Sequence, residues 1–235
     1  MRNIIIASTS TVHGGDYLSY ILEDLARHLK DAQTVLFIPY ARPSGMSYDD
    51  YTDVARKAFV KINKKVEGIH TYDNPKQAIE NAEAIFVGGG NTFVLINQLY
   101  KNDLLNALKS SINSGTPYLG TSAGSNICGL TVKTTNDMPV VYPPSFKALG
   151  LVPFNINPHY LDPDTNSTHM GETRETRIKE FHNFNTEPVI GLREGSWLQV
   201  EGESIVLKGV LTARIFECNK APYEVESGTE LNEMH

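Results

Sequence analysis

Short apolar runs recur along the chain, and segments of mixed polarity separate them. Four of these runs are continuous, and they lie at residues 4–7, 35–38, 84–87 and 117–119. Such runs are typical of parallel strands covered by helices on both faces. Apolar residues at helical spacing between the runs predict helices at residues 17–29, 51–66, 92–100 and 104–113. The pattern therefore predicts an α/β fold whose mostly parallel sheet is flanked by helices on both faces.

The pattern changes in the last quarter of the chain. A continuous run at residues 189–192 predicts one more parallel strand, whereas residues 197–200, 204–207 and 213–216 alternate between apolar and polar positions. Alternation with Glu201-Gly202 as a turn predicts an antiparallel meander appended to the sheet. A short strand is also expected at residues 68–70. Because no linker or repeat interrupts the pattern, residues 1–235 are expected to form a single domain with a polar tail from about residue 226.

Composition narrows the classes of function. A chain of 235 residues is long enough for one large domain, and its net charge of -6 argues against a nucleic-acid surface. Cys128 and Cys218 lie far apart without the spacing of metal ligands, so we expect reduced thiols, a cytoplasmic location and no metal or cofactor. No apolar stretch approaches the ~20 residues that a membrane span requires. The oligomeric state is not evident from the sequence.

The first candidate for catalysis is the pentapeptide Gly120-Thr121-Ser122-Ala123-Gly124, which follows the strand at residues 117–119. A serine between two glycines, at a tight turn from a strand into a helix, is the context of a nucleophile elbow. The turn would hold the Ser122 hydroxyl at the carboxyl edge of the sheet, and the first free amides of the following helix could stabilise an oxyanion there. Taken alone, the motif is also compatible with an ordinary glycine-rich turn.

A second glycine-rich loop follows the strand at residues 84–87, with the sequence Gly88-Gly89-Gly90-Asn91-Thr92. Three consecutive glycines permit close approach to the backbone and leave amides free to point at an anion. No Lys-Ser or Lys-Thr pair follows them, so a phosphate-binding loop of the Walker type is not supported. We expect the amides of Gly90 and Ala123 to form the oxyanion hole.

Ser122 needs a base, and His159 best fits that position because it ends the apolar segment at residues 151–156. Two carboxylates could orient this histidine. Asp137 lies in the loop Thr134-Thr135-Asn136-Asp137-Met138-Pro139, and Glu194 follows the strand at residues 189–192. Chain order cannot decide between them, because a triad is defined by geometry. We hold Glu194 to be the partner of His159, since its strand is predicted to end at the same edge as Ser122.

Several motifs, in this order along the chain, resemble those of the peptidase E family of aspartyl dipeptidases, from residue 4 to about residue 216. They are the triple-glycine loop, the Ser122 pentapeptide, the Asp137 loop, Ile156-Asn157-Pro158-His159, Gly171-Glu172-Thr173-Arg174-Glu175 and Gly191-Leu192-Arg193-Glu194-Gly195. The resemblance implies a fold similar to the class I glutamine amidotransferases. It also implies hydrolysis of dipeptides, and of some short peptides, that begin with aspartate.

The resemblance also implies roles for single residues. It makes Ser122 the nucleophile, His159 the base and either Asp137 or Glu194 the acid. It makes Arg174 the residue that holds the aspartate side chain of the substrate, and we also expect Asn91 to contact the substrate. The chain departs from the family pattern where Thr121 replaces an aromatic residue and Arg193 replaces a proline.

Two other functions remain open from the sequence. One is a cyanophycinase-like hydrolase of β-linked aspartyl peptides, and the other is a non-catalytic ligand-binding protein with the same fold. The intact Ser122 and His159 speak against the second. An unrelated α/β-hydrolase esterase fits less well, because that layout does not explain the triple-glycine loop.

Overall fold

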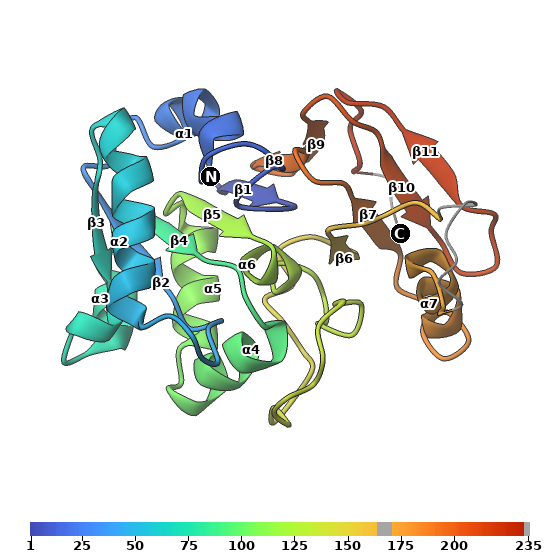
Figure 1. Ribbon diagram of the computed structural model, residues 1–235, viewed down its shortest axis with the longest axis horizontal. Helices are drawn as coiled ribbons and strands as arrows, with labels where there is room; N and C mark the ends of the chain where they lie inside the picture. The colour runs from blue at the N-terminus through green and yellow to red at the C-terminus, as the bar shows by residue number, and fades with distance from the viewer. Residues whose placement is uncertain (164–170, 233–235) are drawn as a thin grey trace.

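The computed structural model describes residues 1–163 and 171–232, which form two β-sheets with helices packed around them (Figure 1). The larger sheet has seven strands in the order β3-β2-β4-β5-β1-β8-β9. The first five strands run parallel, whereas β8 and β9 are antiparallel to their neighbours. The strands are β1 (Asn3–Ala7), β2 (Thr34–Ile38), β3 (Lys65–Gly68), β4 (Ile85–Val87), β5 (Tyr118–Thr121), β8 (Trp197–Glu201) and β9 (Ser204–Lys208).

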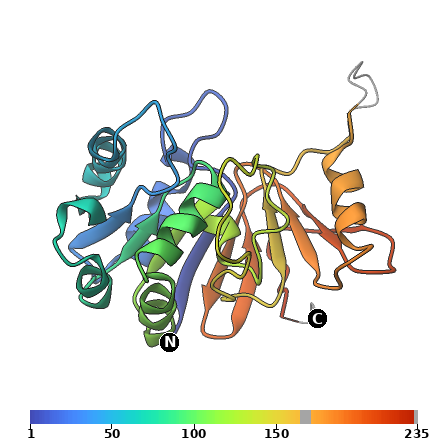
Figure 2. The same ribbon diagram turned by 90° about the horizontal axis from the view of Figure 1, so that it is seen from below.

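Helices cover both faces of this sheet, which is why its central strands are apolar throughout (Figure 2). In β1, Ile4 and Ile6 face one apolar cluster and Ile5 faces the other, and all three are fully buried. The expected α/β class is confirmed. The helices on the Ile5 side are α1 (Leu22–His28) and α2 (Tyr48–Phe59), and those on the Ile4 side are α3 (Pro75–Glu80), α4 (Thr92–Lys101), α5 (Leu105–Ser114) and α6 (Ala123–Asn126).

The smaller sheet has the order β11-β10-β7-β6, with β6 and β7 parallel and the other pairs antiparallel. Its apolar cluster includes Tyr160, Val189, Phe216 and Ile178 of the flanking helix. A larger cluster joins residues of both sheets; the single-domain organisation stays a prediction. The elements are β6 (Asn155–Pro158), β7 (Val189–Leu192), β10 (Ala213–Phe216), β11 (Tyr223–Val225) and α7 (Arg174–Phe181).

Two expectations about the last strands are wrong. Strand β7 is parallel, but its partner is β6 and not a strand of the larger sheet. The meander is divided, because β8 and β9 extend the larger sheet beside β1 whereas β10 pairs with β7. The outer edge of β9, where a third strand of the meander would pair, hydrogen-bonds with residues 229–231 instead, and β10 pairs with β7.

Helix boundaries also differ from the expected ones. Leu18 adopts a left-handed conformation, so α1 begins only at Leu22, after a short 3-10 turn. Ser47 caps α2 by accepting a hydrogen bond from the Asp50 amide, and left-handed Asn63 separates this helical region from β3. The expected strand at residues 68–70 is wrong, because β3 ends at Gly68 and a 3-10 turn follows. Among the described residues, no helix has the length and apolar character needed to cross a bilayer.

The polar tail has a structural role at the edge of the larger sheet. The Leu231 amide donates to the Ile205 carbonyl at 2.8 Å, and the Leu207 amide donates to the Thr229 carbonyl at 3.0 Å. Leu231 is buried. The tail therefore satisfies backbone groups of β9 that an open edge strand would expose.

Truncation of Leu231 tests whether the tail is docked in this way. Replacing a buried leucine with alanine typically costs about 2–5 kcal/mol, so we expect Leu231→Ala to lower the free energy of unfolding by at least about 2 kcal/mol. The matched control is Leu211→Ala, because Leu211 is 42% exposed and its truncation should change stability by less than about 0.5 kcal/mol. Urea unfolding measures both effects. Equal midpoints for Leu231→Ala and the wild-type protein would show that the tail does not pack.

Candidate active site

Ser122 sits at a strained turn between β5 and α6, with φ 52° and ψ -109°. Glycines on both sides make this turn possible. A Cβ on Gly120 would lie 2.4 Å from the Gly124 carbonyl oxygen, and one on Gly124 would lie 2.1 Å from the Val87 carbonyl oxygen. Both distances are shorter than any allowed contact. The expected elbow geometry is therefore a consequence of close packing between β5, α6 and β4.

His159 follows directly after β6, and its ring lies between Ser122 and Glu194. His159 Nε2 is 2.8 Å from Ser122 Oγ, and His159 Nδ1 is 2.6 Å from Glu194 Oε1. A carboxylate can only accept hydrogen bonds, so Nδ1 carries the proton and Nε2 of the neutral ring is left to accept from the Ser122 hydroxyl. The three side chains form one continuous hydrogen-bonded chain that is partly open to solvent.

The register of the smaller sheet explains why His159 and Glu194 meet. Pro158 of β6 pairs with Leu192 of β7, and the two strands run parallel. His159 comes one residue after this pair and Glu194 comes two residues after it, so both side chains leave the sheet at the same edge. The expectation that Glu194 leaves the same sheet edge as Ser122 is wrong, because His159 and Glu194 follow strands of the smaller sheet whereas Ser122 follows β5 of the larger one.

Ser8, at the end of β1, joins this edge to the larger sheet. Its Oγ donates to the Leu192 carbonyl at 2.7 Å and accepts from the His159 amide at 2.9 Å. His159 has a positive φ of 54°, which is uncommon for a residue with a side chain. The Ser8 hydroxyl thus helps to hold a strained histidine in place. Sequence reasoning missed Ser8, although its position at the carboxyl end of a central strand was a usable signal.

Tyr20 is a second missed residue, and it lies near Glu194. Burial raises the pKa of Tyr20, and the negative charge of Glu194 raises it further. The Tyr20 hydroxyl donates to the Thr9 carbonyl at 2.6 Å. Tyr20 therefore stays neutral and lies within electrostatic range of the Glu194 carboxylate.

The triple-glycine loop packs tightly against Ser122. A Cβ on Gly89 would lie 3.0 Å from Ser122 Cβ, and one on Gly90 would lie 2.3 Å from the Ala41 carbonyl oxygen. Gly90 also has a φ of 141°, which side chains rarely allow. Within residues 1–163 and 171–232, neither the Gly90 amide nor the Ala123 amide donates to a protein acceptor. Both amides remain available to a ligand.

Asp137 binds the start of α4, whereas the carboxylate bonded to His159 is that of Glu194. Its Oδ2 accepts from the Thr92 amide at 2.7 Å and from Thr135 Oγ1 at 3.0 Å. Asn91 caps the same helix through Oδ1 and donates through Nδ2 to the Met138 carbonyl at 2.9 Å. The two loops are therefore fastened together, and the Asn91 amide group is already engaged within the chain.

Arg174 begins α7, and its side chain forms no ion pair with any residue that the structure describes. Burial and the neighbouring Arg177 lower the pKa of Arg174, whereas the Asp137 carboxylate acts in the opposite direction. Arg174 therefore lies within electrostatic range of Asp137, which belongs to the loop at residues 134–139. Residues 164–170, just before this motif, lie outside the described part of the chain.

Arg193, one of the two departures from the family pattern, is fully committed to other side chains. Its guanidinium binds Asp162 at 2.7 Å and Glu224 at 2.8 Å, and it also donates to Thr212. Hydrogen bonds to the two carboxylates raise the pKa of Arg193. The guanidinium ties the His159 loop to β11 and is not free to bind a substrate carboxylate.

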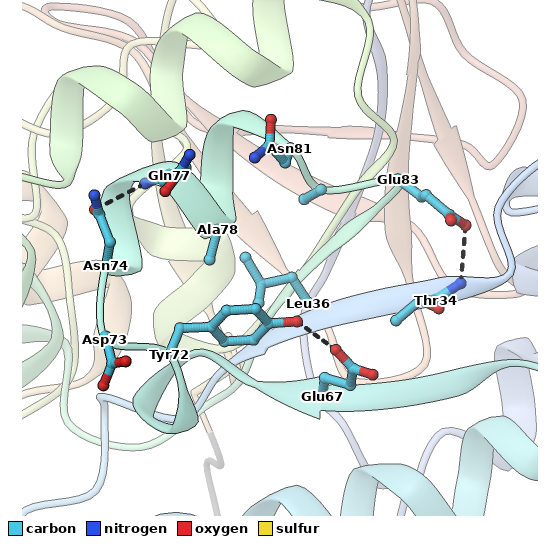
Figure 3. Close-up of a pocket in the computed structure, with 11 residues that line it drawn as sticks. Thr34, Leu36, Glu67, Tyr72, Asp73, Asn74, Gln77, Ala78, Asn81 and Glu83 are labelled. Atoms are coloured by element: carbon cyan, nitrogen blue, oxygen red, sulfur yellow. Dashed lines mark hydrogen bonds between the residues drawn. The ribbon is translucent and has the colours of Figure 1, made fainter.

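A surface cavity of about 500 Å³ lies elsewhere, beside the edge strand β3 (Figure 3). It contains none of the candidate site residues. Its polar side chains largely bond within the chain, as Tyr72 does with Glu67, Asn74 with the Gln77 amide and Glu83 with the Thr34 amide (Figure 3). This cavity is therefore separate from the Ser122 site.

Comparison with known proteins shows the family of the chain. The pattern of peptidase family S51 matches residues 4–208. A protein named Peptidase E, from Streptomyces coelicolor, is 47% identical over 232 residues, which cover 99% of this chain and 94% of that protein. A protein named "Probable alpha-aspartyl dipeptidase", from Drosophila melanogaster, is 47% identical over 228 residues, covering 95% of this chain and 93% of that protein.

A solved structure agrees with the fold. The crystal structure of a peptidase from an acI-B1 actinobacterium superposes with a TM-score of 0.75 at 17% identity, covering 98% of this chain and 96% of that one. The match over residues 4–208 and the full-length relatives show that the chain belongs to peptidase family S51. The strained turn at Ser122 is consistent with a serine peptidase. The resemblance to the peptidase E family is confirmed.

Proposed function

We propose that the chain is a serine dipeptidase that hydrolyses the peptide bond after an N-terminal aspartate. The observation that carries the proposal is the hydrogen-bonded chain from Ser122 through His159 to Glu194. The names of the full-length relatives support aspartate as the first residue. The cytoplasmic location expected from the sequence belongs to the same proposal.

Hydrolysis follows from the chemistry of the three side chains. His159 Nε2 takes the hydroxyl proton as Ser122 Oγ attacks the peptide carbonyl carbon. The tetrahedral intermediate collapses when the carbon–nitrogen bond breaks, and His159 gives the same proton to the leaving amine. Water then attacks the acyl-enzyme with His159 again as base, which releases aspartate and restores the Ser122 hydroxyl.

The Gly90 and Ala123 amides are proposed to stabilise the oxyanion. Ala123 directly follows Ser122, and Gly90 directly follows Gly89, which packs on Ser122. Neither amide has an acceptor within the described residues. Preorganised donors of this kind favour the transition state because the developing charge meets dipoles that are already oriented. The tight packing of Gly90 on Ala41 keeps this loop from relaxing.

Glu194 and Asp137 are proposed to have different roles. Glu194 holds the His159 ring in the productive tautomer and stabilises the imidazolium that forms during attack. Asp137 acts at a distance from the reacting atoms, because its bond to the Thr92 amide fixes the helix that follows the triple-glycine loop. Asp137 is therefore a positioning residue and not the acid of the triad.

Arg174 is proposed to bind the side-chain carboxylate of the substrate's aspartate. It is a partly buried cation without an ion-pair partner among the described residues, and a guanidinium matches a carboxylate in two hydrogen bonds. A substrate without the negative charge would leave this cation unpaired, which costs several kcal/mol when the group is buried. Selection of Asp over Asn follows from that penalty.

The specificity ratio tests this assignment. We expect the wild-type protein to cleave Asp-Leu with a kcat/KM about 100-fold or more above that for Asn-Leu, because ~1.4 kcal/mol corresponds to a factor of ten. Arg174→Ala should reduce the ratio towards one, mainly by slowing Asp-Leu. The control Arg27→Ala removes an exposed arginine on α1 and should leave the ratio unchanged. If Arg174→Ala slows both substrates equally, another residue recognises the carboxylate.

A further inference from the structure

Arg42 is a half-buried arginine for which the structure provides no acidic partner. It follows β2 by four residues, and no carboxylate of the described residues lies within ion-pair distance of it. Its guanidinium carbon lies 4.3 Å from the centre of the Tyr51 ring. Its Nε is shielded from solvent and has no hydrogen-bond partner. A cation in this setting is incompletely satisfied by the protein alone.

Arg42 lies next to the triple-glycine loop. The carbonyl of the preceding residue, Ala41, accepts a hydrogen bond from the Asn91 amide at 2.7 Å. Tyr51, on which Arg42 stacks, donates its hydroxyl to the Gly89 carbonyl at 3.2 Å. Gly89 in turn packs on Ser122. Contacts through Tyr51 and Gly89 therefore join Arg42 to the proposed nucleophile.

The topology also points to this place. The chain leaves β2 towards α2 on one face of the sheet and leaves the adjacent β4 towards α4 on the other face. Figure 2 shows the helices on the two sides of the sheet. In open α/β sheets, ligands bind outside the carboxyl ends of strands where the chain diverges in this way. Arg42 lies in the connection from β2 to α2, and Gly90 lies in the connection from β4 to α4.

The proposed substrate has a second carboxylate that still lacks a partner. A dipeptide carries its α-carboxylate on the leaving residue, one residue beyond the scissile bond. Arg174 is already proposed for the aspartate side chain, and Arg193 is occupied by Asp162 and Glu224. Stacking on Tyr51 orients a planar guanidinium, which suits two-point binding of a carboxylate.

We propose that Arg42 binds the free α-carboxylate of the leaving residue and so favours dipeptides over longer or blocked substrates. This subsite rests on the proposed function, since it presupposes cleavage at Ser122. Arg42 would select the length of the substrate, whereas Arg174 would select its first residue. Arg42 is a binding residue and takes no part in proton transfer.

Asp-Leu and its amide, Asp-Leu-NH₂, differ in the carboxylate alone and test the subsite. A charge-assisted hydrogen-bonded pair corresponds to a preference of about tenfold to a hundredfold, so wild-type kcat/KM should be higher for Asp-Leu by that factor. Arg42→Gln should lower kcat/KM for Asp-Leu by a similar factor, mostly through KM, and leave Asp-Leu-NH₂ unchanged. Arg42→Lys should restore part of the preference. Arg56→Ala, on the exposed side of α2, is the control and should behave as wild type.

The outcomes separate this subsite from the proposed function. Cleavage of Asp-Leu by the wild-type protein without preference over the amide would overturn the subsite alone. So would an equal loss on both substrates in Arg42→Gln, because that pattern indicates support of the glycine loop and not recognition of the carboxylate. If the wild-type protein cleaves neither substrate, the proposed function fails and the subsite fails with it.

Discussion

Replacement of Ser122 with alanine is expected to lower kcat for Asp-Leu by at least about 10⁴-fold. The Ser122 hydroxyl is the only oxygen that the structure places at hydrogen-bond distance from His159 Nε2 among the described residues. Without it, no acyl-enzyme can form, and only oxyanion stabilisation and binding remain. The fold should persist, because the glycines around the elbow and not the hydroxyl determine its conformation.

The assay needs a matched serine and a check of folding. Ser114→Ala replaces an exposed serine at the end of α5 and should keep wild-type activity. Thermal unfolding of Ser122→Ala should coincide with that of the wild-type protein within a few degrees. Activity above a few per cent of wild type in a folded Ser122→Ala would mean that the nucleophile is a different group.

Glu194→Gln is expected to lower kcat by about 10³- to 10⁴-fold. A glutamine amide can donate a hydrogen bond to Nδ1, and this stabilises the tautomer whose Nε2 carries a proton and cannot accept one from Ser122. Loss of the negative charge also removes the partner of the imidazolium. The measurement is kcat with Asp-Leu at saturating concentration.

Asp137→Asn is the matched carboxylate-to-amide variant. Its oxygen can still accept from the Thr92 amide, so we expect a loss of about tenfold or less. A larger loss in Asp137→Asn than in Glu194→Gln would exchange the two assignments. Comparable losses would mean that the helix start matters as much as the orientation of His159.

Local patterns were enough to predict the central architecture. Continuous apolar runs at β1, β2 and β4 indicated parallel strands, because strands buried on both faces have no polar side. The elbow at Ser122 was also evident, since its two glycines leave no room for side chains. These features depend on residues close together in sequence.

Local patterns do not predict which strands pair when they lie far apart in the sequence. Nothing in residues 189–192 distinguishes a strand beside β1 from one beside β6, and in the structure β8 takes the place beside β1 while β7 pairs with β6. The tail likewise contains Leu231, whose burial depends on β9. Both outcomes depend on contacts between segments that lie far apart in the sequence.

Ser122, His159 and Glu194 were predictable from the sequence, but the contacts between them and the supporting Ser8 were not. His159 and Glu194 were expected at one edge, yet their contact depends on the pairing of Pro158 with Leu192. Asp137 is the second candidate in the sequence, and its bond to the Thr92 amide, which excludes it from that role, spans 45 positions. The ion pairs of Arg193 with Asp162 and Glu224 each span 31 positions.

The most direct test of the central claim is a comparison of three substrates with the wild-type protein. Release of the second amino acid is followed for α-linked Asp-Leu, for Asn-Leu and for a β-linked Asp-Arg unit. The proposed function predicts a kcat/KM for Asp-Leu at least about 100-fold above the other two values. Faster cleavage of the β-linked unit, or no cleavage of Asp-Leu, would contradict the assignment as an aspartyl dipeptidase.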